Sequence, residues 1–145
     1  MTAALLDVNV LIALMWPAHE GHGRVQEWFG EHAGSGWATC PFTEAAFVRI
    51  VANPAFSRDA VTPWEAVKLL EANTKHKGHQ FWGDEIGLVA ATRGFEHQLT
   101  GHQQVTDAYL LGLAMHKKGK LATMDRGVSE LLAERSLERE FLVMI

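Results

Sequence analysis

Residues 3–16, AALLDVNVLIALMW, decide the fold. The apolar residues before Asp7 indicate a short buried strand, and the residues after it indicate a short helix closed by Pro17. A second apolar run, KLATM at residues 120–124, also stops at a carboxylate, Asp125. Such runs alternate with helical periodicity along the chain, which predicts an α/β fold with a largely parallel sheet.

The apolar pattern predicts about five strands, separated by six or seven helices. Strands are expected at 3–7, 36–40, 78–83, 120–124 and 140–145. Helices are expected at 8–16, 24–32, 41–53, 63–75, 84–91, 105–118 and 127–133. Thr62, followed by Pro63 and then by Glu65, has the pattern of a capping box, which places the start of one helix.

Length and charge narrow the class of protein. A chain of 145 residues fits one domain, so we expect residues 1–145 to share one buried core. The net charge of -4 argues against a protein that coats nucleic acid, for which a pI above about 9 is typical. Two basic stretches, KHKGH at 75–79 and HKKGK at 116–120, are open to two interpretations, solvated loop charge or phosphate contact.

The single cysteine, Cys40, and the N-terminal run limit the compartment. One cysteine excludes an internal disulfide and a zinc site with several cysteines, and its place after an apolar run favours a buried structural thiol. The N-terminal run is broken by Asp7 and Asn9 and lacks the basic leader of a signal peptide. Because no segment approaches about 18 consecutive apolar residues, we expect no membrane helix and a cytoplasmic protein.

Glu44 and Asp107 differ from most other acids because each heads the apolar face of an expected helix. The residues three, four and seven positions further on are Phe47, Val48 and Val51, and Leu110, Leu111 and Ala114. A carboxylate in that position points toward the core. Either acid alone is equally explained as a helix-start acid favoured by the helix dipole, with Thr43 or Thr106 as the cap.

Three of these four acids are expected at one edge of the sheet. A helix that follows a strand of a parallel sheet begins at the carboxyl edge of that strand, where ligands also bind. Asp7 and Asp125 end strands, and Glu44 begins the helix after the strand at 36–40, so all three belong to that edge. The pattern by itself does not place Asp107 there.

Carboxylates gathered in a small space predict a metal site. Two unit charges about 4 Å apart repel by about 4 kcal/mol at an effective dielectric of 20, so a cation or protonation must offset them. Oxygen ligands alone suit Mg²⁺ or Mn²⁺, and such a site supports attack of activated water on a phosphodiester. The HEGH stretch at 19–22 lacks the HExxH spacing of zinc proteases, which favours a surface helix start there.

Four stretches in this order and spacing, LLDVNVLIAL, TEAAFVRI, TDAYLLGLA and LATMDRG, resemble the PIN-domain ribonucleases. VapC-like toxins of toxin–antitoxin systems are the most similar group. The resemblance extends from Leu5 to the terminal strand. It implies a three-layer α/β/α sandwich on a mainly parallel sheet, and an endoribonuclease that depends on Mg²⁺ or Mn²⁺.

The resemblance also assigns roles to the acids. The implied catalytic residues are Asp7, Glu44, Asp107 and Asp125. Asp7 and Asp107 would hold the metal, and Glu44 would position or deprotonate the attacking water. Asp125 would complete the shell or hold a second ion.

Three neighbours of the acids have implied or open roles. Asn9 and Thr123 match polar positions that orient the acids, and Asn9 is equally explained as a helix cap. For Arg126 three roles are open: neutralising the acids, contacting a phosphate, or facing solvent.

The partners implied by the resemblance are an RNA substrate, commonly transfer or ribosomal RNA, a second copy of the chain in a homodimer, and a cognate antitoxin protein. The two basic stretches would then be candidate phosphate contacts. The alternatives are a housekeeping PIN nuclease in RNA processing, a phosphatase with Asp7 as nucleophile, and a non-catalytic scaffold. The DVN stretch lacks the second Asp expected of aspartyl-phosphate hydrolases, and the complete set of acids argues against a scaffold.

Overall fold

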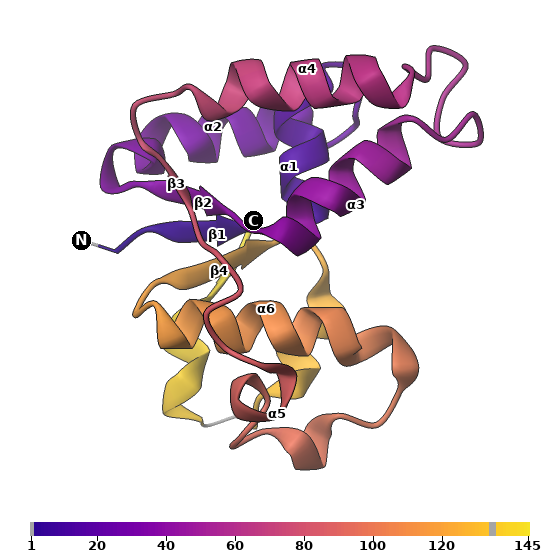
Figure 1. Ribbon diagram of the computed structural model, residues 1–145. Helices are drawn as coiled ribbons and strands as arrows, with labels where there is room; N and C mark the ends of the chain where they lie inside the picture. The colour runs from indigo at the N-terminus through magenta and orange to yellow at the C-terminus, as the bar shows by residue number, and fades with distance from the viewer. Residues whose placement is uncertain (1, 134–135) are drawn as a thin grey trace.

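A five-stranded parallel sheet lies at the centre of the computed structural model, which describes residues 2–133 and 136–145 (Figure 1). The strands are β1 Ala4–Leu6, β2 Trp37–Thr39, β3 His79–Phe81, β4 Lys120–Thr123 and β5 Leu142–Met144. Their spatial order is β3-β2-β1-β4-β5, and every neighbouring pair is parallel. All five strands lie within the predicted ranges, and the chain order changes direction between β1 and β4.

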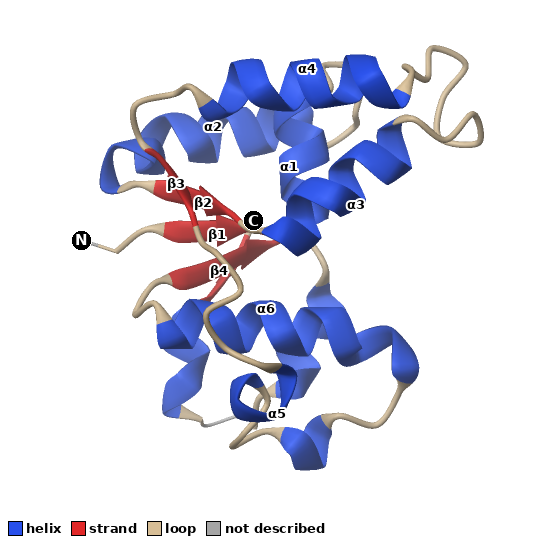
Figure 2. Ribbon diagram, in the orientation of Figure 1, coloured by secondary structure: helices blue, strands red, loops and turns tan. Residues whose placement is uncertain are grey.

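Helices cover both faces of the sheet, which gives three layers (Figure 2). One face is covered by α1 Val8–Met15, α2 His22–His32, α3 Pro41–Val51 and α4 Pro63–Thr74, and the other by α5 Leu88–Ala91 and α6 Val105–His116. The 3₁₀ helices are η1 Ala33–Ser35, η2 Glu96–Gln98, η3 His102–Gln104, η4 Arg126–Leu131 and η5 Leu137–Phe141. The predicted α/β/α sandwich is confirmed. None of the helices in the described part of the chain is long and apolar enough to span a membrane.

The two helical layers explain why the central strand β1 and most of β4 are continuous apolar runs. Leu5 of β1 and Leu121 of β4 pack into the core beneath α6, whereas their neighbours Leu6 and Ala122 pack into the core beneath α1 and α3. A strand buried on both faces leaves no solvated side for polar residues. A polar side chain in such a strand therefore needs a partner within the protein.

Local signals for helix starts are confirmed in part. Thr62 Oγ1 accepts the N–H of Glu65 at 3.1 Å, and Glu65 Oε1 accepts the N–H of Thr62 at 3.3 Å, so the capping box forms as predicted. The helices that contain Glu44 and Asp107 begin earlier than the threonine caps suggested: Cys40 is the N-cap of α3, and Gln104 is the N-cap of α6. Cys40 is fully buried, as predicted.

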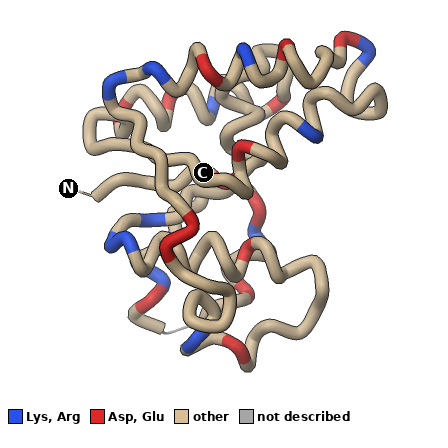
Figure 3. The backbone as a smooth tube through the Cα atoms, viewed as in Figure 1, with Lys and Arg blue, Asp and Glu red and all other residues tan. Residues whose placement is uncertain are grey.

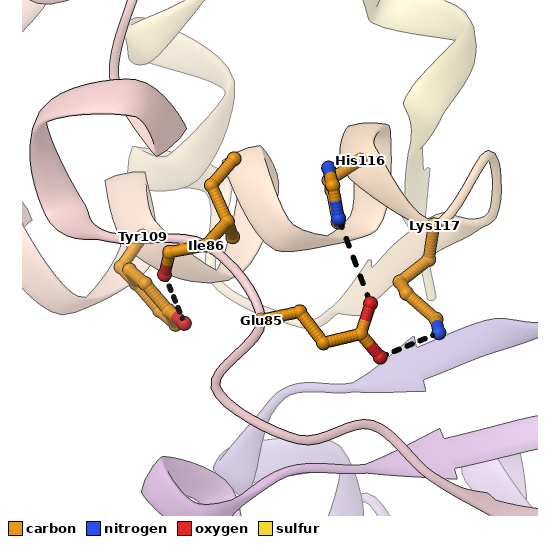
Figure 4. A network of polar contacts seen from close by, with 5 residues as sticks. All are labelled: Glu85, Ile86, Tyr109, His116 and Lys117. Atoms are coloured by element: carbon orange, nitrogen blue, oxygen red, sulfur yellow. Dashed lines mark hydrogen bonds and ion pairs between the residues drawn. The ribbon is translucent and has the colours of Figure 1, made fainter.

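The helix expected at 84–91 is wrong over its first half, because only Leu88–Ala91 is helical. The preceding backbone is fixed by side chains of α6 and its end instead (Figure 4). The Tyr109 hydroxyl donates to the carbonyl of Ile86 at 2.9 Å, and Glu85 pairs with Lys117 Nζ at 2.9 Å and His116 Nε2 at 3.5 Å. These long-range contacts hold the segment in a non-helical path that its own sequence does not indicate.

The helix expected at 127–133 forms as a 3₁₀ helix, Arg126–Leu131. At its end the guanidinium of Arg139 donates to the carbonyls of Ser129, Leu132 and Ala133 at 3.3, 3.0 and 2.8 Å. An arginine further along the chain thus satisfies the carbonyls that a longer helix would have used internally.

Candidate active site

Asp7 lies directly after β1, where the carboxyl edge of the sheet meets the start of α1. Its Oδ1 accepts the N–H of Val8 at 2.8 Å, which caps the helix, and its Oδ2 accepts the hydroxyl of Thr123 at 2.8 Å. The side chain is only 4% exposed. Burial raises the pKa of Asp7 above its ordinary value of 3.8, and the charge of Asp125 raises it further, whereas the hydrogen bonds lower it.

Thr123, the last residue of β4, links the two acids that end strands. Its hydroxyl donates to Asp7 and accepts the N–H of Asp125 at 3.0 Å. The Asn9 amide donates to Thr123 Oγ1 at 3.3 Å and to Asp7 Oδ2 at 3.4 Å, and its oxygen accepts the N–H of Met124 at 3.1 Å. These contacts agree with an orienting role for Asn9 and Thr123, and Asp7 is the helix cap.

Asp107 lies with Asp7 and Asp125 at this edge, which the sequence pattern left open. It occupies the first turn of α6 and is partly buried. Burial, followed by the charges of Asp7 and Asp125, raises the pKa of Asp107 to about 6. Asp125 itself is exposed, and its Oδ1 accepts the N–H of Gly127 at 2.8 Å. The three aspartates therefore share one site where the strand order changes direction, the usual ligand position in open parallel sheets.

Glu44 occupies the same edge one strand away and has partners of its own. It lies in the first turn of α3, and its Oε2 accepts the hydroxyl of Thr39, the last residue of β2, at 2.6 Å. Thr39 Oγ1 is also 2.7 Å from His79 Nε2, on the first residue of β3. The structure thus brings Asp7, Asp107 and Asp125 together, whereas Glu44 lies at the end of the neighbouring strand β2 and is held by a separate network.

The donor set at this edge fits a hydrated magnesium or manganese ion. Among the described residues, no three His, Cys, Asp or Glu side chains converge closely enough to enclose an ion by themselves. Mg²⁺ usually keeps several waters and takes one or two carboxylates together with substrate phosphates, which is the number that Asp7 and Asp107 supply. Both acids have raised pKa values, so a neighbouring cation would stabilise their ionised forms.

Comparison with known proteins identifies the family. The model of the PIN domain matches residues 4–132. The chain belongs to the PIN-domain family. This PIN domain is 42% identical over 127 residues to ribonuclease VapC39 of Mycobacterium tuberculosis, an alignment that covers 88% of this chain and 91% of the relative. It is 44% identical over 132 residues to ribonuclease VapC38 of the same species, covering 91% and 92% of the two chains. It is therefore a VapC-like PIN domain.

A solved structure supports the fold. A chain in the crystal structure of VapBC2 from Rickettsia felis, bound to a DNA fragment from their promoter, superposes with a TM-score of 0.62. The superposition covers 99% of this PIN domain and 97% of that chain, at 12% sequence identity. The sandwich is thus retained where most of the sequence has changed.

The two basic stretches of the PIN domain lie away from the acids. Residues 75–78 lead into β3 and residues 117–119 lead into β4, so both belong to the amino edge of the parallel sheet. Figure 3 shows basic segments on either side of the N-terminus, on the side of the sheet where the strands begin. Lys117 is also paired with Glu85. Their position favours solvated loop charge over phosphate contacts at the acidic site.

The histidines of the HEGH stretch have structural partners. His19 Nδ1 accepts the N–H of Gly21 at 2.9 Å, and His22 Nδ1 lies 2.7 Å from the carbonyl of Ala13. His22 is the first residue of α2, which agrees with the predicted surface helix start.

Thr39 and His79 are site residues that sequence reasoning missed. One signal was present: Thr39 is a polar residue at the end of a buried strand, as Thr123 is, and each hydroxyl binds an acid that follows a strand. No signal marked His79, because its contact depends on the pairing of β2 with β3.

Proposed function

We propose that this VapC-like PIN domain is a metal-dependent endoribonuclease, the toxin of a toxin–antitoxin pair. The observation that carries the proposal is the set of three aspartates at the point where the strand order changes direction, two of them with raised pKa values. The identity to VapC ribonucleases over most of the chain supports the same activity.

The four acids and Thr123 have different roles in phosphodiester hydrolysis. Asp7 and Asp107 would hold Mg²⁺ or Mn²⁺, which when bound stabilises negative charge on the phosphate oxygens. Glu44 orients the attacking water and accepts its proton. Asp125 completes the shell at the exposed side of the site, and Thr123 keeps Asp7 and Asp125 in register.

The proposed partners follow from this assignment. The substrate is structured RNA, with transfer or ribosomal RNA as the expected class, and a cognate antitoxin covers the acidic edge until it is removed. The toxin acts as a homodimer in the cytoplasm. Finding an open reading frame for a DNA-binding antitoxin beside the gene would support the toxin over the housekeeping nuclease.

A phosphatase that uses Asp7 as nucleophile fits the geometry poorly. Both carboxylate oxygens of Asp7 already accept hydrogen bonds, from Val8 at one oxygen and from Thr123 and Asn9 at the other. At 4% exposure the side chain has little room to attack a phosphoryl group. Failure to trap a phosphoaspartate at Asp7 is the expected result.

The test is RNA cleavage by purified protein with Mg²⁺, Mn²⁺ or EDTA. Asp107→Asn and Asp7→Asn should each lower the cleavage rate by at least about 100-fold, because the charge that stabilises the transition state is no longer held in place. Asp59→Asn, in the exposed loop between α3 and α4, is the matched control and should cleave at the wild-type rate. Cleavage that persists in EDTA, or in both site variants, would contradict the proposal.

A further inference from the structure

A chain of short hydrogen bonds runs from β3 through β2 to the first turn of α3. His79 Nε2 lies 2.7 Å from Thr39 Oγ1, and Thr39 Oγ1 donates to Glu44 Oε2 at 2.6 Å. Thr39 is fully buried, so its hydroxyl depends on these two partners. The contact joins residues that are 40 positions apart in sequence.

The number of available protons determines which atom donates in each of these hydrogen bonds. An ionised carboxylate only accepts hydrogen bonds, and a hydroxyl has one proton to donate. Because Thr39 gives that proton to Glu44, the proton between Thr39 and His79 must come from the imidazole. Nε2 of His79 is therefore the donor, in the neutral Nε2–H tautomer or in the imidazolium form.

His79 is held in place by packing rather than by its own strand alone. Its ring lies against the buried Trp37 ring, with centroids 4.7 Å apart, and Trp37 and His79 are register partners across β2 and β3. Burial lowers the pKa of His79, and the nearby His76 lowers it too, whereas the charge of Glu44 and a hydrogen bond to the backbone of Thr74 raise it. Protonation of the ring leaves the Nε2–H in place, so the chain persists in either charge state.

We propose that Thr39 and His79 are positioning residues for Glu44, which they hold through a directional chain from imidazole to hydroxyl to carboxylate. The chain fixes one carboxylate oxygen, Oε2, and leaves Oε1 to face the attacking water. This inference rests on the proposed role of Glu44 in the ribonuclease reaction. It places a requirement for catalysis on β3, a strand that contributes none of the four acids.

Two substitutions each remove one of these hydrogen bonds. Thr39→Val keeps the shape of the side chain and removes the hydroxyl, and His79→Leu removes the donor on a strand at the edge of the sheet. Each should lower kcat of RNA cleavage by about 10–100-fold with little change in KM, as is typical of groups that orient catalytic ligands. Thr39→Ser and His79→Gln keep a hydroxyl and an N–H donor and should restore most of the rate.

The split between kcat and KM, together with rescue by the conservative variants, separates positioning from a general structural role. Loss of either donor should lower kcat in folded protein and leave RNA binding intact, because Glu44 is still present but is less well oriented. Thr92→Val is the matched control, because it removes a partly buried hydroxyl that bonds only backbone carbonyls of α5. Its kcat and KM should equal those of the wild type.

The outcomes distinguish this inference from the proposed function. If folded Thr39→Val and His79→Leu retain the wild-type kcat while Asp7→Asn and Asp107→Asn are inactive, the positioning role is wrong and the ribonuclease site stands. If Asp7→Asn and Asp107→Asn are also active, the proposed function itself fails. Should Thr39→Val unfold in thermal melts, His79→Leu and His79→Gln provide the same comparison on the more exposed strand.

Discussion

The two edges of the parallel sheet carry opposite charge in different surroundings. At the carboxyl edge, Asp7 is buried with three hydrogen bonds, and Asp107 is partly buried beside it. At the amino edge, Lys75, Lys77 and Lys118 are exposed on loops. The strands end in the first case and begin in the second, so one sheet presents two unlike surfaces.

The two edges differ in the free energy that their charged groups cost the folded state. An exposed lysine on a loop stays hydrated and costs little, whereas burial of a carboxylate opposes its ionisation. Burial raises the pKa of both Asp7 and Asp107, so ionisation of either carboxyl group opposes folding. Buried acids with raised pKa values and charged neighbours are candidates for function.

Of the substitutions that compare the two edges, removal of the Thr123 hydroxyl should have the largest effect on RNA cleavage. Thr123→Val removes the donor to Asp7 and the acceptor for the Asp125 N–H. The rate of RNA cleavage should fall by about 10–100-fold, and the melting temperature should fall as well, because buried Asp7 loses a hydrogen bond. Thr92→Val controls for loss of a threonine hydroxyl, and an unchanged rate in Thr123→Val would remove the reason to regard this edge as organised.

We expect a smaller effect on how the melting temperature of the metal-free protein depends on pH. The pKa of Asp107 is raised from 3.8 to about 6, so the folded state binds its proton more tightly than the unfolded state. The stabilisation from this proton is present below about pH 4 and is lost as pH rises through about 6. Thermal melts of metal-free protein should show that loss, and Asp107→Asn should show less of it.

Addition of Mg²⁺ to the same thermal melts tests whether Asp107 binds the ion. Binding to the folded state should raise the melting temperature of the wild type at pH 7 more than at pH 4.5, because the ion binds ionised carboxylates. Asp107→Asn should lose this response and Asp59→Asn should keep it. A Mg²⁺ response in Asp107→Asn equal to that of the wild type would contradict metal binding by Asp107.

We expect the smallest effect on RNA binding, from substitution of a single basic residue at one edge or the other. Arg126 lies exposed next to Asp125 at the acidic edge, and Lys77 lies exposed at the amino edge. Arg126→Gln should raise KM for RNA and reduce the salt dependence of binding by about one unit of slope, as for loss of a phosphate contact. Lys77→Gln should leave both unchanged, and a larger effect for Lys77 would show that RNA reaches around to the amino edge.

Local pattern predicted most of the architecture. The five strands, the start of α4 at Thr62 and the acids at strand ends all follow from apolar runs, caps and spacing within a few residues. The error in helix placement lies at residues 84–87, where the Tyr109 hydroxyl of α6 bonds the carbonyl of Ile86. That partner is 23 positions away in sequence, so local periodicity could not indicate it.

The sequence by itself determined that Asp7 and Asp125 follow buried strands and that Glu44 begins the helix after one, because periodicity and strand ends are local properties. Local pattern did not place Asp107, which the resemblance to PIN domains assigned to the site and the structure places beside Asp7 and Asp125. Only the tertiary structure decided that His79 reaches Glu44 through Thr39 and that the basic stretches lie at the other edge. Those facts depend on strand order and register. Both are set by packing between distant segments, which no single stretch of the chain encodes.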